Sequence, residues 1–240
     1  MKKWTPKPLS FDGFRNISDI LSPLEEPVKD ETLQDEDSEN PEQHIVAHHR
    51  YGHRHLSRKA SSEEALSRSL DWYFQEGDCY HCFSFGDVDS LTFFKHVLHQ
   101  QRVLYLALST WCMAGEDVDD LRSWYDRGMI GRVDFYVGEI FPGSYPLVDE
   151  QVKDFVTACG GRRVVFRNHS KIMMVVGERF DCLIESSAKV NTNPRSENTV
   201  LTVDRQLVAD YIELFNGIIS FDPFSRDTQP YIIPERRLAP

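Results

Sequence analysis

Residues 102–141 read RVLYLALSTWCMAGEDVDDLRSWYDRGMIGRVDFYVGEIF and hold two apolar runs separated by an amphipathic one. Residues 102–110 form a continuous apolar run of strand length, and residues 132–141 also have the pattern of a strand. Between them, residues 116–131 begin with acids, repeat apolar positions at helical spacing and end at a glycine, which is typical of a helix. A strand, a helix and a second strand in this order favour two parallel strands joined by a crossover helix.

The same alternation extends in both directions from this segment. Further helices are expected at 61–74, 87–100, 147–161 and 204–219, and further strands at 79–85, 162–176 (as a pair) and 180–188. The sequence therefore predicts an α/β fold with a mixed, largely parallel sheet flanked by helices.

The N-terminal quarter of the chain has a different composition. Residues 1–43 contain five prolines, a dense run of acids and few large apolar side chains, so they cannot bury enough surface to offset their ordering entropy. Residues 44–60, HIVAHHRYGHRHLSRKA, hold five histidines and four basic residues; a basic linker is expected, and metal binding is the alternative. We expect a disordered acidic leader and His/Arg-rich linker over 1–60, and one folded domain over 61–240.

Charge and cysteine content limit the environment and the partners. Residues 25–42 account for −8 of the net charge of −11, so the remainder is near neutral and compatible with an anionic partner. No apolar run approaches the ~20 residues of a membrane span, and no signal-peptide pattern is present. Five cysteines at irregular spacing fit a reducing compartment, and the C-x-x-C at 79–82 lacks the second ligand pair that zinc needs. We expect a cytoplasmic protein without a metal site or a membrane contact.

Residues 167–175, RNHSKIMMV, interrupt an apolar pattern with two polar side chains. Positions i and i+2 of a strand face the same way, so His169 and Lys171 are expected to project together. Burying such a pair is costly unless a ligand or a partner satisfies it. The pair is therefore a candidate functional site.

The polar residues that follow suit phosphoryl transfer. A neutral imidazole can attack phosphorus and form a covalent intermediate, which makes His169 the candidate nucleophile. A carboxylate on the other ring nitrogen fixes the tautomer, and Glu197 is the candidate for that role. This chemistry requires no metal. The candidates for holding the phosphate oxygens are Lys171, Asn191 and Asn193.

Two loops that follow predicted strands, at 109–115 and 139–146, are further candidates. Loops at the carboxyl ends of parallel strands are where α/β sheets place their sites. Ordinary connecting loops are the alternative. The candidate lining residues are Ser109, Thr110, Trp111, Glu139 and Tyr145.

Residues 80–222 resemble the phospholipase D superfamily, whose signature runs H-x-K-x4-D-x6-G-S-x-N. His169 and Lys171 match its first two positions and Ser187 matches its serine, while the pair Glu197 and Asn198 is similar to one in the small single-motif bacterial endonucleases. The chain departs from the signature in four respects: Val176 stands at the Asp position, Ser186 at the Gly position and Lys189 at the Asn position (with Asn191 two residues on), and the spacing from Lys171 to Ser187 is longer.

The resemblance implies a phospholipase D-like domain over 61–240 and a metal-independent phosphodiesterase, with DNA (single-stranded DNA included) as the expected substrate. The superfamily site uses two His-x-Lys motifs and this chain has one, so a homodimer is implied in which His169 is nucleophile in one subunit and general acid in the other. The implied phosphate-binding residues are Ser187, Lys189, Asn191, Asn193, Asn198 and Ser109. Two alternatives remain open: a catalytically silent, dimeric nucleic-acid-binding module of the same fold, and a lipid phosphodiesterase.

Overall fold

The computed structural model describes residues 63–84, 88–187 and 196–234. The leader and linker expected over 1–60 lie outside the described residues, so their disorder and the boundary at residue 61 stay predictions.

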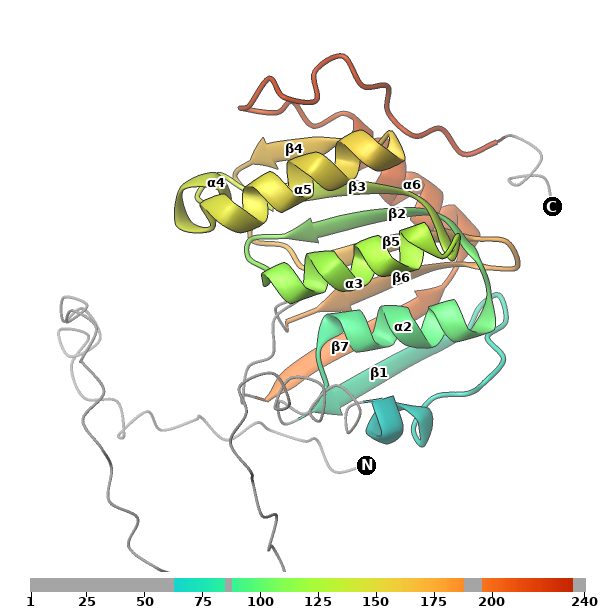
Figure 1. Ribbon diagram of the computed structural model, residues 1–240. Helices are drawn as coiled ribbons and strands as arrows, with labels where there is room; N and C mark the ends of the chain where they lie inside the picture. The colour runs from blue at the N-terminus through green and yellow to red at the C-terminus, as the bar shows by residue number, and fades with distance from the viewer. Residues whose placement is uncertain (1–62, 85–87, 188–195, 235–240) are drawn as a thin grey trace, which may run out of the picture. The chain divides into compact units, whose positions relative to one another are not determined.

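A single seven-stranded sheet forms the centre of the domain (Figure 1). Its strand order is β1-β7-β6-β5-β2-β3-β4, so the first and last strands in sequence are neighbours. The strands are β1 (Cys79–Ser84), β2 (Val103–Thr110), β3 (Ile130–Gly138), β4 (Arg163–Phe166), β5 (Ile172–Gly177), β6 (Asp181–Ser186) and β7 (Glu197–Val203).

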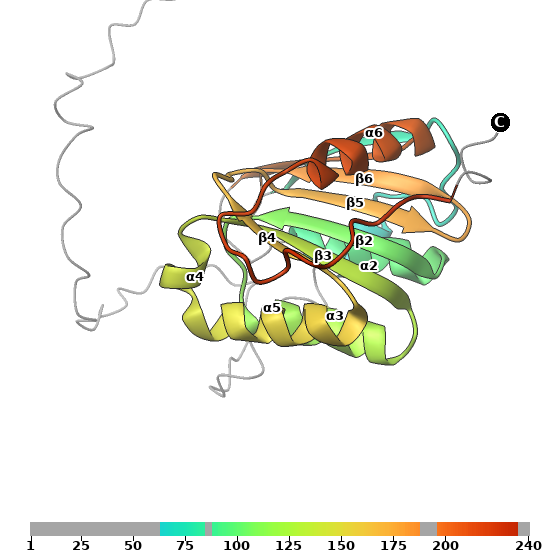
Figure 2. The ribbon, with the colours of Figure 1, turned by 90° about the horizontal axis from the view of Figure 1, so that it is seen from above.

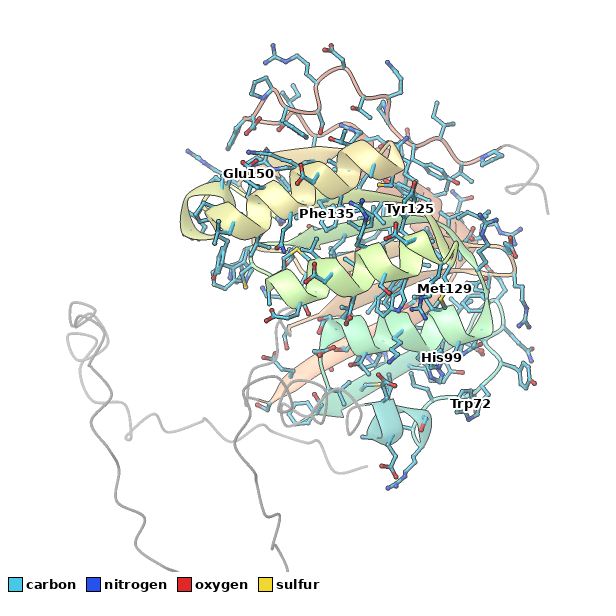
Figure 3. The ribbon with its side chains drawn as sticks, viewed as in Figure 1. Trp72, His99, Tyr125, Met129, Phe135 and Glu150 are labelled. Carbon is cyan, nitrogen blue, oxygen red and sulfur yellow. The ribbon has the colours of Figure 1, made fainter. Side chains whose placement is uncertain are left out.

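Helices cover both faces of this sheet (Figure 2). Helices α2 (Ser90–Gln100), α3 (Gly115–Asp126) and α5 (Pro146–Cys159) share one face, and α6 (Arg205–Asn216) lies on the other, against β5 and β6. A short α4 (Phe141–Ser144) precedes α5. Two cores result, one on each face of the sheet. Figure 3 shows one of their members, Phe135, which points from β3 toward α5 and meets Phe155 edge to face at 5.9 Å.

The predicted α/β class, with a mixed sheet flanked by helices, is confirmed. Parallel pairing is confined to β2–β3 and β3–β4, whereas the other four pairs are antiparallel, so the parallel share is smaller than the sequence predicted. For the β5–β6 pair the cause is the length of the connection. Only residues 178–180 separate β5 from β6, and so short a connection allows a hairpin but not a crossover.

The helix expected at 61–74 is shorter in the structure, where the described helical residues are 63–67. The hydroxyls of Ser67 and Ser69 donate to the carbonyls of Glu64 and Ala65. Such local side-chain bonds compete with continued helix formation, and turns follow.

The topology brings one end of each of the seven strands to a common edge, which we call the site edge. The carboxyl ends of β1, β2, β3, β4 and β6 meet there with the amino ends of β5 and β7. The residues at this edge are Ser84, Ser109, Gly138, Phe166, Ile172, Ser186 and Glu197. No helix in the described part of the chain is long and apolar enough to cross a membrane.

Candidate functional site

The loop between β4 and β5 carries the His-x-Lys pair, and Asn168 fixes that loop to the site edge. Asn168 Nδ2 lies 3.0 Å from Ser109 Oγ, 3.3 Å from the Thr110 carbonyl oxygen and 3.0 Å from the Tyr136 carbonyl oxygen. Its Oδ1 accepts from both the backbone N–H (2.8 Å) and the hydroxyl (2.7 Å) of Ser170. One side chain therefore joins the loop to the ends of β2 and β3.

Ser109 belongs to this network. Its side chain is fully buried at the end of β2, and its Oγ lies 2.6 Å from Ser170 Oγ as well as within reach of Asn168. The hydroxyl that was expected to contact substrate thus contacts the loop on either side of His169.

Exchanging the Asn168 amide for a carboxylate tests this arrangement. Asn168→Asp would turn an oxygen toward the carbonyls of Thr110 and Tyr136, and we expect a loss of about 1–3 kcal/mol in the free energy of unfolding and of about 10²-fold in turnover, because the loop shifts. Urea unfolding and phosphodiester cleavage measure the two effects. Asn216→Asp is the matched control, since Asn216 Nδ2 donates to the Tyr231 carbonyl away from the loop. Asn216→Asp should lower the free energy of unfolding and leave turnover unchanged. Equal losses of turnover in both variants would contradict the role of Asn168.

The two motif side chains leave the loop toward Trp111. His169 is exposed, and its ring stacks on the indole of Trp111 with centroids 5.5 Å apart and planes 26° from parallel. Lys171 Nζ lies 6.0 Å from the Trp111 ring centroid and donates to the His169 carbonyl oxygen at 2.8 Å. The structure thus brings His169 and Lys171 to the same indole, but from a loop and not from the strand that the i, i+2 argument assumed, since β4 ends at Phe166 and β5 begins at Ile172.

A second polar group lies two strands away along the same edge. Ser187 Oγ donates to Glu197 Oε2 and accepts from the Asn198 backbone N–H at 2.9 Å, and Ser187 N–H donates to the Asn198 carbonyl at 2.9 Å. The register carries this group close to the motif, because the neighbouring Ser186 N–H donates to the Lys171 carbonyl oxygen at 2.9 Å. The residues that the superfamily resemblance selected therefore meet at one edge, next to the ends of β5, β6 and β7.

Glu197 does not make the contact that was expected of it. Its buried carboxylate accepts from Ser187, and within residues 63–84, 88–187 and 196–234 no hydrogen bond joins it to His169. The remaining candidates Lys189, Asn191 and Asn193 lie outside the described residues.

Val176 stands where the superfamily signature has an aspartate, and a buried aspartate lies next to it in the structure. Val176 is buried in the core beneath α6, and Asp181 lies directly opposite it across the β5–β6 hairpin. The buried Asp181 carboxylate accepts from the Gly177 backbone N–H at 3.1 Å and lies 3.6 Å from Arg205 Nε. A buried acid is therefore present beside the position where the signature has one.

Tyr211 of α6 approaches the site edge from the other face. Its hydroxyl donates to Glu185 at 3.1 Å, and burial, followed by the nearby Glu185 carboxylate, raises the pKa of Tyr211. The phenol is thus held protonated, which makes Tyr211 a poor candidate for a general base.

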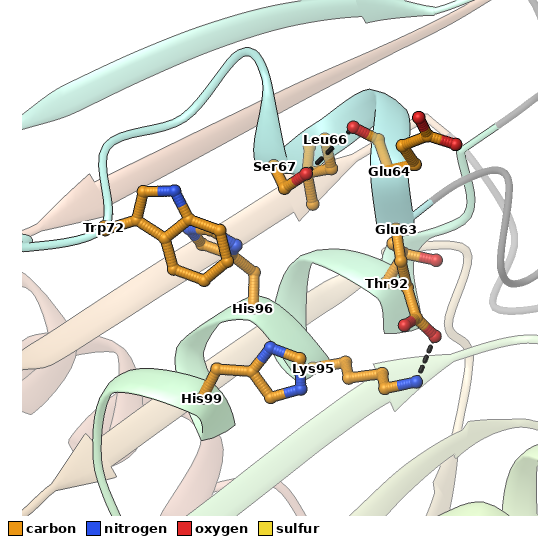
Figure 4. A pocket seen from close by; sticks show the side chains of 9 residues that line it. All are labelled: Glu63, Glu64, Leu66, Ser67, Trp72, Thr92, Lys95, His96 and His99. Carbon is orange, nitrogen blue, oxygen red and sulfur yellow. Dashed lines mark hydrogen bonds and ion pairs between the residues drawn. The ribbon is translucent and has the colours of Figure 1, made fainter.

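A cavity of about 290 Å³ lies elsewhere, between helix 63–67 and α2 (Figure 4). His96 Nε2 lies 3.0 Å from the Asp71 carbonyl oxygen, and burial lowers the pKa of His96. None of the residues predicted for the site lines this cavity. Its lining residues are Glu63, Glu64, Leu66, Ser67, Trp72, Thr92, Lys95, His96 and His99. Among the residues that the structure describes, no group of three His, Cys, Asp or Glu is arranged to hold a metal ion.

Asn168 and Ser170 were missed from the sequence. A signal was present, since both flank His169 in RNHSK and short polar side chains commonly bond to nearby backbone in loops. Their long-range partners on β2 and β3 could not be read from that signal.

Comparison with known proteins gives distant structural likenesses but no family. No family model and no curated protein matches the chain. A polyphosphate kinase from Porphyromonas gingivalis matches at 14% identity over 68% of this chain and 28% of its own, with a TM-score of 0.46. TrmBL2, described as an archaeal chromatin protein with a novel mode of DNA binding, matches at 14% identity over 69% of this chain and 61% of its own, with a TM-score of 0.42. A phosphatidylserine synthase from Haemophilus influenzae Rd KW20 matches at 13% identity over 55% and 36%, with a TM-score of 0.40.

These likenesses are distant, and the chain spans less than a third of the length of the polyphosphate kinase. With TM-scores below 0.5 they decide nothing about the chemistry of this chain. The fold and the loop define an α/β protein with a polar site at one edge of its sheet. The residues of that site resemble those of the phospholipase D superfamily.

Proposed function

We propose that this chain is a metal-independent phosphodiesterase that cleaves DNA through a covalent phosphohistidine on His169. The observation that carries the proposal is the position of His169 and Lys171, which leave a loop pinned at the site edge and face the same indole. An exposed imidazole and an ammonium side by side can attack phosphorus and hold its oxygens.

In the first step a ring nitrogen of His169 attacks phosphorus, the N–P bond forms and the bond to the leaving oxygen breaks. The leaving oxygen takes a proton from the imidazolium of His169 in a second copy of the chain. In the second step that imidazole removes a proton from water, the water oxygen attacks phosphorus and the N–P bond breaks. Lys171 holds the negative oxygens throughout, and Ser187 and Asn198 bind the flanking phosphate.

A homodimer follows from this scheme, because the described part of the chain presents one His-x-Lys pair and the scheme needs two imidazoles. A two-fold axis through the site edge would place the two copies of His169 on opposite sides of one phosphate.

DNA is proposed as the substrate on two grounds. The single motif and the Glu197–Asn198 pair resemble the small endonucleases, which is an argument by analogy. The His169 ring is also exposed, so a polymer backbone can reach it.

Five cysteines, all free thiols, support a cytoplasmic location.

The test is cleavage in excess chelator of single-stranded DNA, double-stranded DNA, a simple aryl phosphodiester and a choline phosphodiester, with wild type beside His169→Ala. We expect chelator-resistant cleavage of DNA that falls by about 10⁴-fold in the variant. Cleavage of the choline ester alone would replace the nuclease with a lipid phosphodiesterase. Activity that needs metal, or that persists in His169→Ala, would overturn the proposal.

One observation favours a second candidate, a silent nucleic-acid-binding module. Glu197 is engaged by Ser187, so the carboxylate expected to orient His169 is committed elsewhere. Such a module would bind DNA with strong salt dependence and would turn over none of the four substrates.

A further inference from the structure

Trp111 is the aromatic side chain against which both motif residues lie. Its indole stacks on the His169 ring and lies 6.0 Å from Lys171 Nζ, while Lys171 also bonds to the His169 backbone. The π face of an indole attracts an ammonium or an imidazolium and also packs against a neutral imidazole. One half-buried ring therefore contacts two side chains whose charges differ during the reaction.

Stacking has a consequence that a carboxylate partner does not share. A carboxylate bonded to a ring nitrogen takes one of the two nitrogens out of use, whereas a stacked indole contacts the face of the ring and neither nitrogen. His169 can then hold its place as a neutral nucleophile and as a protonated acid. This fits the finding that Glu197 bonds to Ser187 instead of His169.

Gly138 explains how Trp111 comes so close to the motif loop. A Cβ on Gly138, at the end of β3, would lie 3.1 Å from the Asn168 carbonyl oxygen and 3.3 Å from Trp111 Cβ. The loop after β2 and the loop before β5 therefore approach each other across a glycine that leaves room for both. The position of Trp111 against His169 depends on this close approach.

We propose that Trp111 is a positioning residue that fixes the His169 ring and the Lys171 ammonium relative to each other. The inference rests on the proposed function for its catalytic meaning, but the positioning itself can be measured without turnover. The pertinent variants are Trp111→Leu, which removes the aromatic face, Trp111→Phe, which keeps a smaller one, and Gly138→Ala, which keeps the indole and displaces it.

The primary readout is the proton NMR signal of the His169 ring. A ring proton above an indole is shifted upfield by its ring current, and the signal is assigned among the nine histidines by its loss in His169→Gln. We expect it to move downfield in Trp111→Leu, to move less in Trp111→Phe, and to move part of the way in Gly138→Ala. Turnover should fall about 10²-fold in Trp111→Leu and recover to within about fivefold of wild type in Trp111→Phe.

Trp72→Leu is the matched control, because Trp72 is an exposed tryptophan that also lies against a histidine, with its ring centroid 5.3 Å from that of His96 and away from the site edge. It should change the signal of His96 and leave that of His169 and the turnover as in wild type. An unmoved His169 signal in both Trp111→Leu and Gly138→Ala overturns the inference, as does a moved signal with full turnover. A protein that shows the signal changes but cleaves no phosphodiester loses the proposed function and keeps the positioning role of Trp111.

Discussion

Dimers that pair a wild-type chain with a His169→Ala chain are expected to be inactive. The proposed reaction needs one His169 as nucleophile and the other as acid, so a mixed dimer holds only one of the two imidazoles of its single shared site. Neither chain can compensate for the other, because the two-fold axis makes the two imidazoles parts of one site. The expected loss is therefore complete in the mixed species and not merely half.

Titration of one chain with the other measures this. Co-refolding wild type with increasing His169→Ala should lower cleavage as the square of the wild-type fraction, whereas a site within one chain gives a linear fall. His81→Ala serves as the matched control, since His81 is an exposed histidine of β1 outside the proposed machinery. Mixtures with His81→Ala should keep full activity at every ratio. A linear fall with His169→Ala would remove the shared site and leave the chemistry of His169 untouched.

The parts of the site that the sequence predicted are those with local spacing. His169 and Lys171 are two residues apart, so they stay close in the loop as well, where Lys171 Nζ donates to the His169 carbonyl oxygen and both side chains lie against Trp111. The Asn168 contacts with β2 and β3 and the Ser187–Glu197 bond join residues far apart in sequence. Such pairs depend on strand order, and strand order is not a local property.

The fold divides in the same way. Apolar periodicity predicted the strands and helices on either side of residues 102–141 with two exceptions: the strand β7 was not predicted, and the helix expected at 61–74 ends at residue 67. It could not predict that β1 pairs with β7, in the register Ser84↔Glu197, or that β5 to β7 form consecutive antiparallel pairs beside the parallel strands. β5 is buried and reads as an apolar run although both of its neighbours are antiparallel, so such a run does not report the direction of the neighbouring strand.

The largest loss of stability is expected from Asp149→Ala. Arg163 of β4 is fully buried, and Asp149 of α5 binds its guanidinium with both oxygens, at 2.6 Å to Nε and 2.8 Å to Nη2. Asp222 lies 3.0 Å from Nη1 and is partly exposed. Removing Asp149 leaves a buried cation with this one weaker partner, and an uncompensated charge of this kind costs about 3–5 kcal/mol. That is a large share of the roughly 5–15 kcal/mol that stabilise a domain.

Two further variants separate the buried charge from general damage to α5. Glu150→Ala, one residue along the helix and labelled in Figure 3, breaks the exposed pair with Lys153 and should cost less than about 1 kcal/mol. The double variant Asp149→Ala with Arg163→Met removes both charges and should regain most of the lost free energy of unfolding, because a buried pair can be replaced by apolar side chains at little net cost. Urea unfolding of the four proteins decides the matter. If the double variant is as unstable as Asp149→Ala, the loss of stability comes from packing between α5 and β4 and not from the ion pair. The ion pair would then not be what holds β4, and the loop of His169 that follows it, against α5.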